Sequence, residues 1–167
     1  MFATCPYICP LCHPLYMGRI DGKLDMYEGM DDSLLGLAMN GVVRKAVSGL
    51  AKVAGAENAS SIYLTILISS ISIDGEINET EYELVRDIFS EMVGKEVTID
   101  ELRVSLAASD LGDISTIRST TANLIRSLGA ADPTVRDDVL ELMAMFCAMD
   151  HKVTPAERNW LLELESL

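Results

Sequence analysis

DPTVRDDVLELMAMFCAM, residues 132–149 of the chain, has the features of a strong α-helix. Asp132 is of a type that caps helix N-termini, and Pro133 stands at the first helical position, where a proline forfeits no hydrogen bond. Apolar residues then recur with the helical period, at positions 135, 139, 142, 143 and 146. The stretch therefore predicts a helix and points to a helical fold.

Helix start signals recur along the rest of the chain. Residues 154–157, TPAE, form a capping box with proline at the first helical position, and residues 98–101, TIDE, and 78–81, NETE, are further caps. The segment 59–73 suits a strand nearly as well as a helix, but no partner strand is visible. We therefore predict an all-α fold, a compact single-domain bundle of about seven helices, with helices over 34–55, 59–73, 79–93, 99–108, 114–128, 133–149 and 155–165.

Composition narrows the classes of partner. The chain has 167 residues, enough for one domain with its own core, and 26 acidic against 13 basic residues give a net charge of −13. Such a surface repels phosphate backbones, so we expect no nucleic-acid partner. A cation is a better candidate partner for an acidic surface, although an acidic composition ordinarily reflects solubility alone.

The sequence predicts no membrane span and no signal peptide. The apolar run 62–73 has 12 residues, where a span needs about 20. The longer run 33–56 is interrupted by Arg44, Lys45 and Lys52, as in a helix that lies in a membrane interface. We prefer a helix packed on the domain, with the membrane surface as the alternative, and expect a cytoplasmic protein with reduced thiols.

Two stretches 76 residues apart repeat one pattern. Asp74 matches Asp150 and Glu81 matches Glu157, each Glu lying seven residues after its Asp. Flanking apolar positions agree as well, pairing Leu67 with Met143, Ile71 with Cys147, Ile77 with Val153, Leu84 with Trp160, and Ile88 with Leu164. We therefore expect an internal repeat of two helix pairs related by a pseudo-two-fold axis.

The four repeated acids have two competing interpretations. Each Glu occupies the third position of a capping box and needs no ligand. Each Asp lies near a helix C-terminus, where the helix dipole disfavours an anion unless a turn N–H, a basic neighbour or a cation compensates it. Because the arrangement occurs twice, we favour a calcium-like divalent cation held by Asp74, Glu81, Asp150 and Glu157. An EF-hand is excluded, since the sixth position from Asp74 is Glu79 and the twelfth is Val85.

This duplicated pattern resembles the TerB-like (tellurite-resistance TerB) domain family. The resemblance covers residues 33–167 and is carried by SISIDGEINETEYELV (70–85) and FCAMDHKVTPAERNWLLEL (146–164). It implies a compact, intracellular, all-helical adaptor or sensor rather than an enzyme. Such domains are linked to proteins of stress-response and membrane-associated complexes, and a divalent-cation site built from the four repeated acids is proposed for them. His151 and Lys152 replace Gly75 and Glu76, and the lysine weakens the case for metal at the second turn.

Residues 1–32 are expected to form an N-terminal tail that contains cysteines and need not be ordered, before a domain over 33–167. Cys5, Cys9, Cys12 and His13 match three kinds of site: a radical-enzyme iron–sulfur cluster, a c-type haem attachment, and a zinc site. The first needs a larger β/α barrel and the second needs export, so zinc is the candidate ligand. The alternative is that residues 1–16 precede the true start at Met17.

Little in the sequence supports catalysis. His151 has no serine or cysteine at motif spacing, and residues 49–58 lack the order of a phosphate-binding loop. Cys147 falls on the apolar face of its predicted helix, so we expect it in the core. We therefore predict a non-enzymatic protein.

Overall fold

The computed structural model describes residues 19–71, 79, 82–83, 86–87, 90, 94–108 and 113–167. Within these residues the elements are helices and no strand is present, which confirms the all-α prediction. The helices are α1 (Arg19–Glu28), α2 (Asp32–Ala54), α3 (Ala56–Ile71), α5 (Ile99–Ala108), α6 (Ile114–Ala131), α7 (Pro133–Cys147) and α8 (Pro155–Glu165). The predicted helix over 79–93 falls largely outside the described residues.

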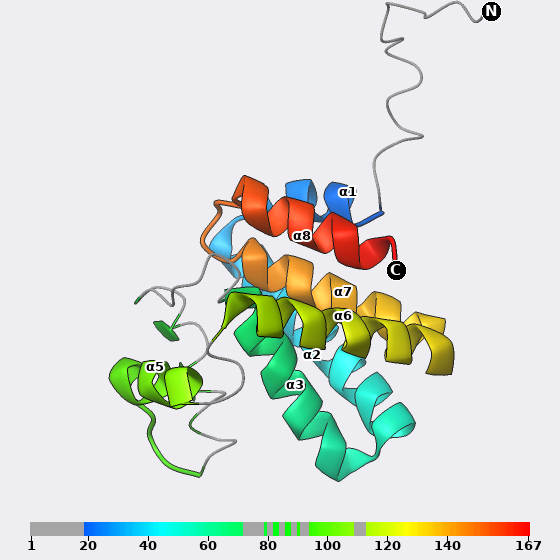
Figure 1. Ribbon diagram of the computed structural model, residues 1–167. Coiled ribbons are helices and arrows are strands. Elements are labelled where there is room, and N and C mark those ends of the chain that lie inside the picture. The colour runs from blue at the N-terminus through cyan, green and yellow to red at the C-terminus, as the bar shows by residue number, and fades with distance from the viewer. Residues whose placement is uncertain are drawn as a thin grey trace, which may run out of the picture.

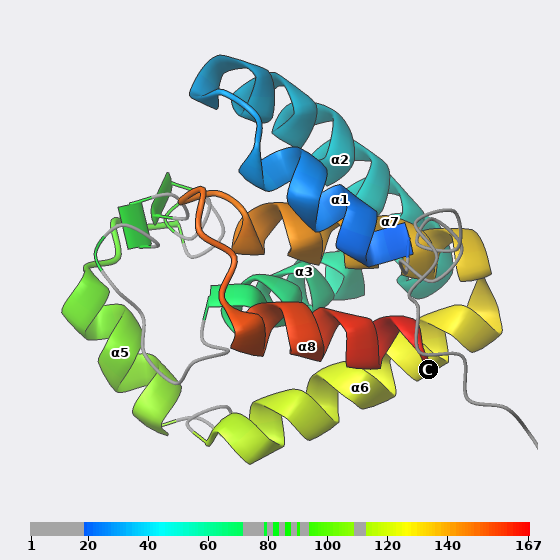
Figure 2. The ribbon, with the colours of Figure 1, turned by 90° about the horizontal axis from the view of Figure 1, so that it is seen from above.

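Helix α7 is the centre of the bundle, because α1, α2, α3, α6 and α8 all pack against it. In Figure 1, α1 and α8 lie together above α7, whereas α2 and α3 lie below it. Figure 2, seen from above, shows α6 running alongside α8 and α5 at the side of the bundle. The arrangement follows from the sequence of α7, whose second half is apolar on nearly every side and must therefore be covered all round.

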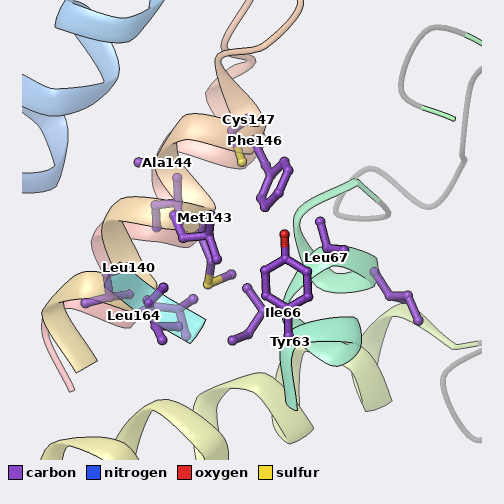
Figure 3. Packing of buried hydrophobic residues seen from close by; sticks show 14 of the residues in the cluster. Tyr63, Ile66, Leu67, Leu140, Met143, Ala144, Phe146, Cys147 and Leu164 are labelled. Atoms are coloured by element: carbon purple, nitrogen blue, oxygen red, sulfur yellow. The ribbon is translucent and has the colours of Figure 1, made fainter. Parts of the chain in front are cut away.

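The core forms where α3 meets α7. Ile66 and Leu67 of α3 and Met143 of α7 are fully buried, and Phe146 is nearly so. Figure 3 shows the side chains of Tyr63, Ile66 and Leu67 turned toward the α7 helix. The Ile-rich segment 59–73, which also suited a strand, is thus helical as far as Ile71, and it supplies one side of the main core; residues 72 and 73 lie outside the described residues.

Several helix ends are fixed by the predicted caps. Thr154 and Glu157 form the capping box of α8, and Thr98 and Glu101 do the same for α5. Asp132 ends α6 and begins α7, and its carboxylate accepts the N–H groups of Thr134 at 2.9 Å and Val135 at 3.4 Å. One aspartate therefore forms the whole turn between two helices.

Helix α1 was not predicted and lies within the segment 1–32 that the sequence presented as a tail. Its residues Ile20, Leu24 and Tyr27 are buried against the bundle. The Tyr27 hydroxyl donates to Glu141 of α7 at 2.8 Å, and Lys23 pairs with the same carboxylate. The packed fold therefore includes residues 19–28, while residues 1–18 lie outside the described part of the chain.

The two repeat helices α3 and α7 pack directly on one another. Leu67 and its matched residue Met143 are both fully buried. Cys147, buried as predicted, places its thiol 4.0 Å from the carbonyl oxygen of Ser70. In the repeat alignment, positions 70 and 147 match positions 146 and 71, so nearly equivalent points of the two helices meet. A pseudo-two-fold axis that relates α3 to α7 requires that equivalent points of the two helices meet in this way.

We predict that Gly49→Ala is less stable than Gly41→Ala, although both replace a glycine of α2 by alanine. A Cβ at Gly49 would lie 2.9 Å from Cγ2 of Val135, a stiff β-branched side chain on α7, whereas a Cβ at Gly41 meets nothing within 4 Å. Alanine gains about 1 kcal/mol of helix propensity at either site, but overpacking at residue 49 costs about 1–3 kcal/mol. In urea denaturation, the free energy of unfolding of Gly41→Ala should therefore exceed that of the unsubstituted protein. The free energy of unfolding of Gly49→Ala should be about 1–3 kcal/mol lower than that of Gly41→Ala. Equal midpoints would contradict the close approach of α2 and α7.

Candidate functional site

The second copy of the repeated acids lies at the α7–α8 turn, which holds Asp150, and in the first turn of α8, which holds Glu157. The N–H of Lys152 donates to Oδ1 of Asp150 at 2.9 Å, which forms the turn hydrogen bond typical of aspartate. His151 adopts a positive φ of 58°, a conformation that glycine adopts more readily than histidine. Glycine stands at the matched position of the first repeat, Gly75, which lies outside the described residues.

Glu157 is the third residue of the capping box rather than a free ligand. Its Oε2 accepts both the N–H and the hydroxyl of Thr154, each at 2.7 Å, and the residue is 8% exposed. Asp150 is thus compensated by a turn N–H, and Glu157 caps its own helix. These are the structural roles that the sequence analysis set against a cation site.

The other predicted ligands lie outside the described residues. These are Asp74 and Glu81 of the first repeat, and Cys5, Cys9, Cys12 and His13 of the N-terminal cluster. Within the part of the chain that the structure describes, no three His, Cys, Asp or Glu side chains gather as a metal site would require. The distance between the two repeated turns, and with it a cation shared between them, therefore stays a prediction.

His151 makes two contacts with residues far away in the sequence, which no local pattern predicts. Its Nε2 lies 2.7 Å from Oδ1 of Asp32, the first residue of α2, and its Nδ1 lies 3.3 Å from the carbonyl oxygen of Glu28, the last residue of α1. The hydrogen bond with Asp32, followed by that with the Glu28 carbonyl, raises the pKa of His151. The turn is thereby tied to a connection more than 100 residues earlier in the chain.

A row of acids on α1 strengthens the same junction. Arg158 of α8 pairs with Asp21, with Asp25 at 2.8 Å, and with Glu28 at 3.7 Å. Oε1 of Glu28 also accepts the N–H of Val153 at 3.2 Å. The spacing of positions 21, 25 and 28 places the acids on one helix face and was visible in the sequence, but their partner was not.

The exposed side of α2 carries apolar and basic side chains. Leu37 is 71% exposed and Leu34 56% exposed, and Val47 is also at the surface. From position 33 to position 56 the chain has no Asp or Glu but contains Arg44, Lys45 and Lys52. Lys45 pairs with Asp138 of α7 at 2.6 Å, whereas Arg44 and Lys52 form no ion pair with a described residue. We call the set Leu34, Leu37, Gly41, Arg44, Val47 and Lys52 the α2 face.

The described helices include none that is long and apolar enough to cross a membrane. This holds for α2 as well, although it is the longest of them with 23 residues. Its apolar side chains are divided between the core and the surface, since Leu35, Ala46 and Leu50 are buried while Leu34 and Leu37 are exposed. The exposed ones are therefore available for contacts at the surface.

No family model matches the chain, and neither a curated protein nor a solved structure does. The TerB-like resemblance accordingly remains a prediction that rests on the two quoted stretches.

Proposed function

We propose that the chain is a non-enzymatic adaptor domain that binds a partner protein through the α2 face. The observation that carries the proposal is the charge and polarity of this face: Leu34 and Leu37 are exposed near the start of α2, and basic Arg44 and Lys52 follow on the same helix, on a protein of net charge −13. Exposed leucines are unremarkable singly, but two of them on one helix face, in a stretch that has no acidic residue from position 33 to position 56, are typical of a recognition surface.

The partner that fits is an amphipathic segment that carries acidic residues. Helix α2 has 23 residues and is therefore about 34 Å long, which offers several turns to a partner helix. Gly36 and Gly41 leave open space beside the leucines, so that a partner backbone can approach closely. Carboxylates on the partner would pair with Arg44 and Lys52, giving specificity and faster association.

Chemistry at His151 is disfavoured by its surroundings. Both ring nitrogens already face acceptors, on Asp32 and Glu28, so neither is presented to a substrate. The histidine serves the structure of the junction instead. This supports an adaptor rather than an enzyme, and the TerB-like resemblance implies that such an adaptor works in the response to tellurite or other chemical stress.

A membrane surface is the alternative occupant of the α2 face. Co-sedimentation with vesicles distinguishes it from a partner protein. Arg44 and Lys52 supply about 1 kcal/mol each toward an anionic surface, which the net charge of −13 opposes. We expect the full chain to stay in the supernatant with vesicles of phosphatidylserine and phosphatidylcholine. Pelleting that is lost in Arg44→Glu and Lys52→Glu would show that the α2 face binds lipid and would overturn the partner proposal.

Divalent-cation binding is a second candidate function, favoured by the duplication of the Asp and Glu positions. Asp150→Asn removes the charge but keeps an oxygen that accepts the Lys152 N–H, so it leaves the turn intact. We expect calorimetric titrations with calcium, manganese and zinc to be the same for Asp150→Asn as for the unsubstituted chain, because Asp150 and Glu157 serve the turn and the cap. Heat that disappears in Asp150→Asn would assign a cation to the second turn.

A further inference from the structure

Helices α6 and α8 meet where the side chain of Arg118 covers that of Trp160. The guanidinium carbon of Arg118 lies 5.1 Å from the centroid of the indole ring, which is a cation–π distance. Trp160 is buried in the main core, whereas Arg118 is half-buried and reaches the surface. Figure 2 shows α6 running alongside α8. We call these two side chains the α6–α8 pair.

Both members of the pair bury a hydrogen-bond donor that lacks an acceptor. Among the described residues, none accepts the N–H at Nε of Arg118 or the N–H at Nε1 of Trp160, and both nitrogens are shielded from solvent. Buried polar groups in native proteins are paired with few exceptions, and an unpaired one calls for a water, an ion or a ligand as its partner. Two such donors on side chains in contact point to one acceptor group that serves both.

The carboxylates of the two helices are engaged elsewhere. Helix α6 contains no Asp or Glu, and Asp113 before it serves as its cap. On α8, Glu157 belongs to the capping box, Glu165 accepts a backbone N–H of α1, and Glu163 is exposed. Arg118 accordingly forms no ion pair with a described residue, although the chain has two acidic residues for each basic one. A half-buried guanidinium without a counter-ion is costly, so an anion stabilises it.

The chemistry of the pair defines its ligand. Guanidinium and indole N–H groups donate hydrogen bonds and do not accept them, so the ligand has to bring acceptor oxygens. A planar carboxylate matches the fork of a guanidinium with two parallel hydrogen bonds, and its single negative charge balances the charge of Arg118. The net charge of −13 disfavours a multiply charged anion such as phosphate. A carboxylate is therefore the ligand that fits.

The supports of the pair are fixed by buried contacts. One turn after Arg118, Thr121 is fully buried, and its hydroxyl oxygen lies 2.5 Å from that of Ser69 on α3. Trp160 is 3% exposed and packs with its neighbour Leu161 in the main core. The indole ring in turn supports one face of the guanidinium. A donor that is ordered before binding loses less conformational freedom when the ligand arrives.

We propose that the α6–α8 pair is a carboxylate-binding site. Nε and one terminal nitrogen of Arg118 donate to the two carboxylate oxygens, and Nε1 of Trp160 donates to the same ligand. The ligand enters at the exposed part of Arg118 and is either a small free carboxylic acid or the carboxylate side chain of a peptide, which share this chemistry. The site lies on α6 and α8 rather than on the α2 face, so it does not depend on the proposed adaptor function.

Trp160 reports directly on this site, because it is the single tryptophan of the chain. Sodium acetate, titrated into the full chain at constant ionic strength against sodium chloride, should change the tryptophan fluorescence with saturation. The one indole N–H resonance in the NMR spectrum should move downfield as Nε1 gains an acceptor. We expect a dissociation constant of about 1–100 mM, as suits one charge-assisted pair.

A second probe separates the two sources of the carboxylate. It is a short peptide with one glutamate and with acetylated and amidated ends, so that the side chain is its only carboxylate. Tighter binding of this peptide than of acetate would support the site and assign it to peptide side chains. Equal or weaker binding of the peptide, with acetate bound, would support the site and assign it to free acids.

Substitutions on α6 show whether Arg118 carries the binding. Arg118→Gln removes the charge, and Arg126→Gln is the matched control, since Arg126 is an exposed arginine of the same helix that bonds to Asn123. The affinity for acetate should fall at least about tenfold in Arg118→Gln and stay unchanged in Arg126→Gln. Arg118→Lys keeps the charge but lacks the fork, so its affinity should lie between the two. Circular dichroism should show the same helix content in all three variants.

Three results would overturn the proposal. One is the absence of a saturable response of Trp160 up to about 0.5 M acetate, well above the expected dissociation constant. Another is a response that Arg118→Gln retains in full, because the anion would then bind elsewhere. The third is tighter binding of inorganic phosphate than of acetate, which would contradict the assignment to a carboxylate.

Discussion

Trp160→Ala should lower the free energy of unfolding by about 3–5 kcal/mol, the largest effect we expect from one substitution. Trp160 of α8 is 3% exposed and belongs to the main core. The guanidinium of Arg118 on α6 lies 5.1 Å from the centroid of its ring, so the substitution also removes a cation–π contact. The indole Nε1 is buried with no hydrogen-bond partner among the described residues, however, so its removal offsets part of the lost stability. We therefore expect the loss of unfolding free energy to lie toward the lower end of this range.

Trp160→Leu is the matched control, since leucine occupies the corresponding position 84 of the first repeat. It keeps part of the apolar volume and should be clearly less destabilising than Trp160→Ala. Circular dichroism in urea is the suitable measurement, because both variants lose the tryptophan fluorescence. A loss below about 1 kcal/mol for Trp160→Ala, the typical range for surface positions, would contradict the packing of α8 on the bundle.

Met143→Ala should cost about 2–5 kcal/mol, because Met143 is fully buried on the helix that every other member of the main bundle contacts. Figure 3 shows its side chain between the α3 and α7 helices, close to Ile66. The cavity left there cannot be filled by one neighbour, since α2, α3, α6 and α8 all pack on α7.

Met26→Ala provides the control of the same residue type. Met26 lies on α1 and is 47% exposed, so truncation should change stability by no more than about 0.5 kcal/mol. Chemical denaturation of the two variants under identical conditions gives the comparison. Similar losses for both would mean that α7 is not the centre of the core.

Most of the helical framework could be predicted because its signals are local. Caps and apolar period depend on neighbours within a turn or two, and they located α5 and α8 at the bounds that the structure has. Helix α2 ends one residue early because Gly55 adopts a positive φ of 84°, and α6 continues to Ala131 because Asp132 alone makes the next turn. These differences depend on backbone geometry that residue type only partly determines.

Helix α1 and the contacts of His151 could not be predicted, because they depend on residues that are distant in the sequence. Helix α1 has an apolar spacing at positions 20, 24 and 27, but Asp21, Lys23 and Asp25 interrupt it, and its charges only find partners on α7 and α8. The contact of His151 with Asp32 has no local signature at all. In the sequence His151 was a departure from the repeat, whereas in the structure it joins the turn to α1 and α2.

The acids of the second repeat show the limit of a pattern more sharply. In the sequence alone, the same positions are compatible with a capping box, an Asx turn and a cation site. Distances separate these roles: 2.7 Å from Glu157 to the Thr154 cap, and 2.9 Å from Asp150 to the Lys152 N–H. For this reason the proposed function rests on the α2 face rather than on the repeated acids.

The central claim, that the α2 face binds an acidic partner protein, is tested most directly by photo-crosslinking from Leu37 in the cells from which the chain comes. Val104 on α5, 68% exposed, is the matched control position. We predict an adduct with another protein from Leu37 and none from Val104. The purified partner should then bind the full chain at least about tenfold more weakly after Leu37→Glu or Arg44→Glu, at unchanged thermal stability. Equal crosslinking from both positions, or an affinity that neither substitution changes, would contradict the account.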